Sequence, residues 1–177
     1  MALGRPPKTY TENELYEYAV GALSRRMRTV AELKRLLRQR VESETGLGQT
    51  LVELVIRRLK DQGYLNDSEY AATYSSLRRD NEKFGRMRVI TDLKAKGVHG
   101  EIIEQAVSSA YDEVNEEKQA RAYLKRKRLR KPKNQKEAAR IFRNLARAGF
   151  GASTILRILK KWDVEEETLS ALESESG

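Results

Sequence analysis

Apolar residues recur along most of this chain with the spacing of amphipathic α-helices. Leu15, Ala19, Ala22 and Leu23 form the first such stripe, and similar stripes continue as far as Trp162. Proline, which interrupts helices, occurs only at positions 6, 7 and 132. We therefore predict an all-α protein.

The helical pattern also repeats along the chain. A shift of 52 residues places Leu93 on Leu145 and Gly97 on Gly149. A glycine that ends a helix tolerates the left-handed conformation of a C-terminal cap. We interpret the chain as three tandem three-helix units of helix-turn-helix-like form. Because such small units bury their apolar faces against neighbours, we expect an elongated, curved array.

The expected units span residues 12–65, 66–114 and 115–162. The first matches the others less neatly because its internal loop is longer. An N-terminal arm, residues 1–11, precedes the units, and an acidic tail, residues 163–177, follows them. We expect both the arm and the tail to be flexible.

Residues suited to catalysis or metal binding are scarce. The chain has no cysteine, and its single histidine, His99, lies near two glycines in an expected turn. A metal site needs several ligands, and the sequence has neither a His/Cys cluster nor an HExxH motif. The glycine-containing segment 149–154 lacks the lysine of a P-loop. We expect no enzymatic activity, no metal and no cofactor.

The sequence also carries no signal for a membrane or for export. No apolar run reaches the roughly 20 residues of a membrane-spanning helix. The N-terminus lacks the apolar core of a secretory signal. The absence of cysteine is compatible with a reducing compartment. We expect a cytoplasmic protein without a membrane partner.

Positive charge is concentrated late in the chain. Residues 115–162 hold 16 basic and 3 acidic residues, a net charge of +13, whereas residues 163–177 carry −6. Such a field attracts polyanions, above all nucleic acid phosphates, although a solvated basic surface is the alternative. The predicted DNA contacts are Arg121, Lys125, Arg128 and Lys131. The first three lie on one expected helix face, and Lys131 lies in the loop beyond it.

Several short motifs occur in a specific order and spacing. Those in residues 63–98 are Gly63-Tyr64-Leu65-Asn66-Asp67, Tyr70-Ala71, Gly85-Arg86 through Leu93, and Lys96-Gly97-Val98. Ala22-Leu23-Ser24-Arg25-Arg26 comes earlier in the chain. Together these motifs resemble the RecX family of bacterial recombinase regulators, and the likeness covers about residues 12–162.

This resemblance implies tandem three-helix repeats and a regulatory role in DNA recombination, DNA repair and the SOS response. It implies binding to the RecA–DNA filament, with inhibition of RecA's ATPase and strand exchange. It also implies phosphate contacts to single- or double-stranded DNA, and we expect a monomer. The family motif supplies no catalytic residue. The candidates for contact with RecA, chosen by charge and helix face, are Arg86, Arg88, Lys94 and Lys96.

Two other functions remain open from the sequence. One is a sequence-specific helix-turn-helix transcription regulator, which would prefer one duplex sequence strongly at fixed salt. The other is a helical adaptor that binds RNA or ribosomes through the same basic segment. Inhibition of RecA-dependent ATP hydrolysis would distinguish the RecA regulator from both.

Overall fold

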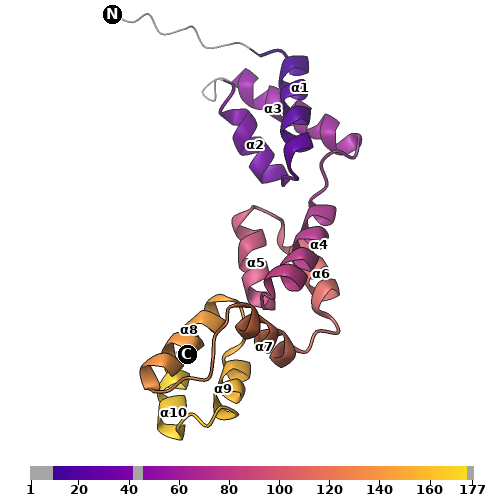
Figure 1. Cartoon of the computed structure of the whole chain (residues 1–177). Coiled ribbons are helices and arrows are strands. Elements are labelled where there is room, and N and C mark those ends of the chain that lie inside the picture. The colour runs from indigo at the N-terminus through magenta and orange to yellow at the C-terminus, as the bar shows by residue number, and fades with distance from the viewer. Residues whose placement is uncertain (1–9, 42–45, 175–177) are drawn as a thin grey trace, which may run out of the picture. The chain divides into compact units, whose positions relative to one another are not determined.

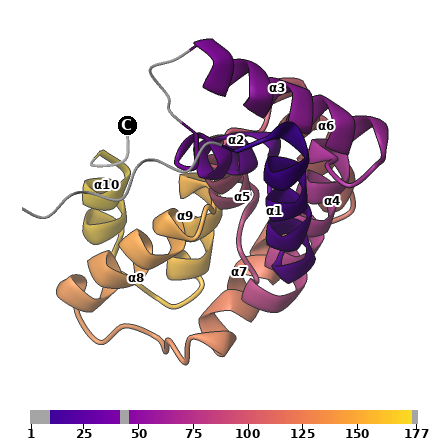
Figure 2. The same cartoon turned by 90° about the horizontal axis from the view of Figure 1, so that it is seen from above.

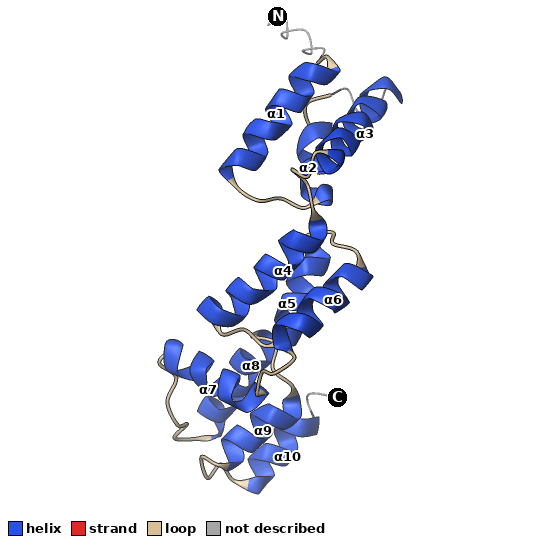
Figure 3. Ribbon diagram, turned by 90° about the vertical axis from the view of Figure 1, so that its right-hand side faces the viewer, coloured by secondary structure: helices blue, strands red, loops and turns tan. Residues whose placement is uncertain are grey.

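The chain is all-helical in the computed structural model, which describes residues 10–41 and 46–174. These residues contain no β-strand (Figures 1 and 3), so the all-α prediction is confirmed. Most of the expected N-terminal arm, residues 1–9, lies outside the described residues. The elements are α1 (Glu12–Arg25), α2 (Val30–Arg38), α3 (Gly46–Asp61), α4 (Asp67–Leu77), the π-helical turn η1 (Arg78–Glu82), α5 (Arg86–Ala95), α6 (Gly100–Tyr111), α7 (Glu116–Arg126), α8 (Gln135–Arg147), α9 (Ala152–Lys160) and α10 (Glu166–Ser174).

Residue contacts divide the chain into two compact units. The first unit comprises Met1–Ala71 and Lys94–Ile102, and the second comprises Ala72–Leu93 and Ile103–Gly177. The division falls within α4, α5 and α6, which are the helices of the second expected repeat. The boundaries expected between three separate repeats therefore stay a prediction.

Polar side chains mark where several helices begin. Thr11 and Thr29 each accept a hydrogen bond from the backbone N–H three residues later, and the carboxylates of Glu14 and Glu32 accept one from the backbone N–H of the cap. Asn134 caps α8 through the same three-residue contact. These bonds satisfy N–H groups that have no partner inside the helix, which is why the helices begin at these residues.

The first unit has its own apolar core, formed by α1, α2 and α3. Leu15, Leu33, Leu37, Val52 and Val55 are fully buried in it. They come from the amphipathic stripes of the three helices, and burying each large aliphatic side chain contributes roughly 1.5–3 kcal/mol.

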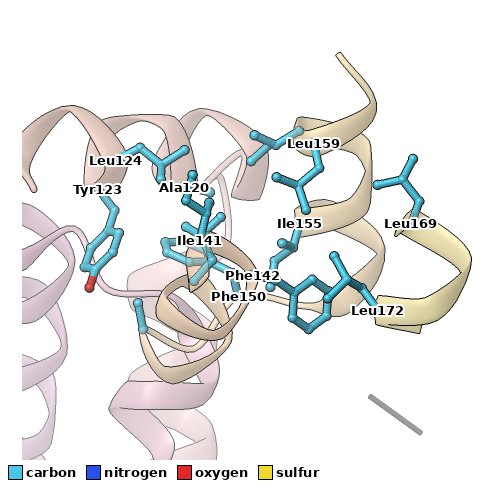
Figure 4. Packing of buried hydrophobic residues seen from close by; sticks show 13 residues of the cluster. Ala120, Tyr123, Leu124, Ile141, Phe142, Phe150, Ile155, Leu159, Leu169 and Leu172 are labelled. Carbon is cyan, nitrogen blue, oxygen red and sulfur yellow. The ribbon is translucent and has the colours of Figure 1, made fainter. Parts of the chain in front are cut away.

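The second unit has a separate core where α7, α8, α9 and α10 meet. Figure 4 shows its side chains pointing toward one another from these four helices. Leu145, Ile155, Ile158 and Leu159 are fully buried. Figures 1 and 2 both place α8, α9 and α10 side by side in this core.

The expectation of a flexible acidic tail is wrong for Glu166–Ser174, which forms α10. Leu169 and Leu172 lie three residues apart on one helix face, and both are buried in the second core. The acidic residues of the tail lie on its exposed side, so the high charge concealed a short apolar stripe. Residues 175–177 lie outside the described residues.

Burial confirms the helical repeat. The second helix of each expected repeat buries two aliphatic side chains four residues apart: Leu33 and Leu37, Val89 and Leu93, and Ile141 and Leu145. These positions are separated by 56 and then 52 residues along the chain. The shift recognised from the sequence thus maps core positions onto core positions.

Two matched glycines end α5 and α8 in closely packed turns. Gly97 and Gly149 have φ angles of +75° and +91°. A Cβ added to Gly97 would lie 2.5 Å from the Ala31 Cβ, and one added to Gly149 would lie 2.2 Å from the Arg88 backbone nitrogen. Each glycine is therefore required by its conformation and by the backbone or side chain packed against it.

Equivalent hydrogen bonds accompany these two turns. In the first unit, the Thr29 hydroxyl donates to the Lys96 carbonyl over 2.7 Å. In the second unit, the Gly85 N–H donates to the Ala148 carbonyl over 2.8 Å. Each carbonyl directly precedes the turn glycine, and each donor directly precedes a second helix. The same docking arrangement therefore occurs twice, once inside each compact unit.

Candidate nucleic-acid interface

Helix α8 carries the clearest charged face in the second unit. Ala138, Ile141, Phe142 and Leu145 hold its apolar side in the core. The opposite side carries basic residues with separations of four, three and four, which places them on one face. These exposed residues are Lys136, Arg140, Arg143 and Arg147.

The four basic side chains of this surface, which we call the α8 stripe, make no ion pair or hydrogen bond with any described residue. The Arg140 and Arg147 carbonyls accept bonds from Asn144 and Arg88, but those are backbone oxygens. Within α8 the single acidic residue is Glu137, which accepts a hydrogen bond from the Lys133 N–H. The stripe therefore offers four cationic groups to an external anion.

The four DNA contacts predicted from the sequence are less available. The Arg121 guanidinium pairs with Glu117 over 3.0 Å, and Lys131 Nζ pairs with Asp163 over 2.8 Å. Lys125 is exposed, and its side chain makes no ion pair with the described residues. Arg128 is exposed as well, but it does not lie on the helix.

The expected stripe through Arg128 is wrong because α7 ends at Arg126. The Lys127 N–H donates to the Tyr123 carbonyl and the Leu129 N–H to the Leu124 carbonyl, which closes the helix. Arg128 adopts φ +55°, the left-handed conformation at which helices commonly terminate. Its side chain therefore leaves the line set by Arg121 and Lys125.

Glu117 explains why Arg121 is a structural cation. Its carboxylate accepts hydrogen bonds from Lys161 and Arg121, and these bonds lower the pKa of Glu117 below its ordinary value. The carboxylate is thus charged at neutral pH and is shared between α7 and the turn after α9. Arg121 would have to give up this contact to bind a phosphate.

The predicted protein contacts also divide into engaged and available residues. The Arg88 guanidinium pairs with Asp92 over 3.0 Å, and Lys96 Nζ pairs with Glu32 over 3.0 Å. Burial is the largest single effect and lowers the pKa of Lys96, but the hydrogen bonds and charge interactions with Glu32 and Tyr70 together outweigh it, so that the pKa is raised. Arg86, whose guanidinium bonds the Ser108 hydroxyl, and Lys94 are exposed.

The α8 stripe was missed at the sequence level, although a signal for it existed. Lys136, Arg140, Arg143 and Arg147 have helical spacing, and Asn134 precedes them as a helix cap. The cluster of basic residues that ends α7 is denser, but its consecutive residues face several directions. Regular spacing of charge is the better guide to one continuous face.

The described residues were also compared with the requirements of a metal site and of a membrane-spanning helix. No group of three or more His, Cys, Asp or Glu side chains among residues 10–41 and 46–174 is arranged to hold a metal ion. In the same residues no helix is both long and apolar enough to cross a membrane.

Comparison with known proteins identifies the family. A family model described as the RecX second three-helix domain matches residues 66–107. The regulatory protein RecX of Deinococcus radiodurans is 35% identical over 153 residues, covering 85% of this chain and 70% of that protein. The regulatory protein RecX of Myxococcus xanthus is 32% identical over 170 residues, covering 88% of each chain.

A solved structure has a fold similar to that of this chain. The crystal structure of RecX from Lactobacillus salivarius matches with a TM-score of 0.62 at 21% identity, covering 86% of this chain and 96% of that one. The sequence motifs, the repeated helices and these relatives point the same way, and the chain belongs to the RecX family of regulatory proteins.

Proposed function

We propose that this protein binds the RecA–DNA filament in the cytoplasm and lowers RecA's ATPase and strand-exchange activities during DNA recombination and repair. Its relatives are named regulatory proteins, which supports a role in control. The observation that carries the DNA part of the proposal is the α8 stripe, a row of exposed cations without internal partners.

The α8 stripe suits phosphates better than bases. Arginine and lysine neutralise phosphates and release condensed counterions, an effect that is independent of sequence. Base readout would require side chains that hydrogen-bond to base edges in a groove. Among the residues of the exposed face, the single amide of Asn144 donates to the Arg140 carbonyl of its own helix. Weak sequence preference is therefore expected.

Contact with RecA is assigned to Arg86 and Lys94 among the four candidates. Both are exposed and neither forms an ion pair with a described residue, although Arg86 bonds the Ser108 hydroxyl, whereas Arg88 and Lys96 are paired with Asp92 and Glu32. Several modest contacts made by different parts of one chain add to a larger affinity when they bind together. No catalytic step is needed, because binding alone changes the equilibrium of the filament.

The test is a titration of this protein into a RecA–single-stranded DNA ATPase reaction. We expect the wild-type protein to lower the rate of ATP hydrolysis. The variant R140E/R143E should need at least about tenfold more protein for half-inhibition, because two phosphate contacts become repulsive. The matched control is R57E/K60E, which makes the same charge change on exposed residues of α3.

Three results would count against the proposal. If excess folded wild-type protein leaves ATP hydrolysis unchanged, the regulatory role is wrong. If R57E/K60E and R140E/R143E weaken inhibition equally, the effect of the α8 residues comes from the net charge of the protein and not from a DNA contact at α8. A strong preference for one duplex sequence at fixed salt would favour the transcription regulator.

A further inference from the structure

A pocket in the second unit lies beside the single tryptophan of the chain. It has a volume of about 380 Å³ and is lined by loop residues 131–135, by turn residues 162–165 and by Thr168. Pockets that hold small ligands have volumes of roughly 300–1,000 Å³. The pocket is therefore large enough for one planar ring system, and it is too small to accept a helix or a duplex.

Trp162 provides an aromatic surface that is held in place. It is half-buried, packs against the second core and also lines the pocket. The turn that holds it is closed by hydrogen bonds from the Trp162 and Val164 N–H groups to the Leu159 carbonyl. An aromatic side chain fixed in this way can stack on a nucleobase without first being ordered.

The pocket is lined by two basic and two acidic residues. Lys131 and Lys133 are exposed, and so are Asp163 and Glu165. Lys131 Nζ pairs with Asp163, which also lines the pocket and adopts φ +56°. The Asp163 side chain is 85% exposed, so its ion pair with Lys131 is weak and a phosphate can replace it.

We propose that this pocket receives one nucleobase of single-stranded DNA. Trp162 stacks on the base, and Lys131 and Lys133 contact the flanking phosphates. A base in a duplex is already stacked and paired, so entry requires a single strand. This inference rests on the DNA binding proposed above and adds base contact at a second place in the same unit.

Trp162 makes the proposal directly testable, because the chain contains no other tryptophan. Its fluorescence is followed while a 12-nucleotide thymidine strand is added to the full-length protein. The comparison ligand is an abasic strand with the same number of phosphates. We expect the thymidine strand to quench Trp162 and the abasic strand to leave it nearly unchanged, while the anisotropy of end-labelled strands records binding of both.

Two variants separate base contact from folding. W162L should weaken binding of the thymidine strand by roughly five- to 150-fold, as expected for loss of one stacked base, and spare the abasic strand. T168V is the control, because the Thr168 hydroxyl is buried without a hydrogen bond and lies out of reach of a bound base. T168V should leave folding and the binding of both strands unchanged.

The outcomes distinguish this pocket from the proposed function. Binding of the thymidine strand without quenching, or equal quenching by the abasic strand, overturns the base pocket and leaves the RecA proposal standing. Quenching together with unchanged RecA ATPase supports the pocket and removes the RecA role. If neither strand binds, both the pocket and the DNA part of the proposed function are wrong.

Discussion

At the scale of single residues, Tyr111 anchors the loop that follows η1. Its hydroxyl donates to the Phe84 carbonyl over 2.9 Å. The Phe84 ring lies 6.3 Å from that of Tyr123, which lies 5.9 Å from the Phe150 ring. These distances suit favourable aromatic pairs. Tyr111 thus fixes an aromatic row that reaches into the core of the second unit.

Burial raises the pKa of Tyr111 to about 12, whereas an unfolded tyrosine titrates near pH 10. Between these values the unfolded chain loses the proton and the folded chain keeps it. The stabilisation is therefore complete below about pH 10 and is lost as the pH rises toward 12. Its slope is at most about 1.4 kcal/mol per pH unit.

Denaturant unfolding at pH 9 and pH 11.5 measures this effect. We expect the free energy of unfolding to fall more steeply with pH in the wild type than in Y111F, which lacks the phenol. Y64F is the control, because Tyr64 is 60% exposed, and it should follow the wild type. Parallel pH dependence in the wild type and Y111F would show that Tyr111 keeps an ordinary pKa.

At the scale of elements, the glycine turns after α5 and α8 determine how the helices dock. Within residues 10–41 and 46–174, three glycines, Gly63, Gly97 and Gly149, have positive φ angles, but their surroundings differ. A Cβ at Gly63 meets no atom within 4 Å, whereas a Cβ at Gly149 meets the Arg88 backbone at 2.2 Å. Conformation and close packing can therefore be separated by experiment.

We predict that G63A lowers the free energy of unfolding by about 1–2 kcal/mol, the cost of a left-handed alanine. G149A should add the cost of overpacking, roughly 1–3 kcal/mol more, because the Arg88 backbone must move. Chemical denaturation of both variants checks the difference. Equal losses would mean that the turn after α8 relaxes freely and does not hold the docking arrangement.

The helices could largely be predicted, because capping residues and apolar stripes are local signals. Thr29, Asn134 and the matched glycines were all recognisable from the sequence. The docking of Gly149 on Arg88 was not, because it joins residues 61 positions apart and the partner is backbone. Helix α10 was missed because its two buried leucines lie among acidic residues.

At the scale of the whole molecule, charge by segment points to a region that holds two basic helices and does not distinguish between them. Residues 115–162 carry +13, and both α7 and α8 lie in that range. Net charge could not reveal that Arg121 is engaged by Glu117 or that Lys131 is engaged by Asp163. The Lys131–Asp163 pair depends on the fold, whereas the Arg121–Glu117 pair and the α8 stripe depend only on spacing within one helix.

The salt dependence of DNA binding tests which helix meets the phosphates. For single-stranded DNA, each phosphate contact contributes roughly 0.7 to the slope of log affinity against log salt. R140Q/R143Q should therefore reduce the slope by about 1.4. R121Q/K125Q should reduce it by half of that or less, because Arg121 already has an acidic partner.

The two double variants remove the same charge from neighbouring helices of one unit, so the general electrostatic loss is equal. Any difference in slope then reports contact and not net charge. Binding of a labelled strand between about 50 and 200 mM salt covers the range in which the slope is measurable. A larger reduction for R121Q/K125Q would return the DNA contact to α7, and it would show that a phosphate displaces Glu117 from Arg121.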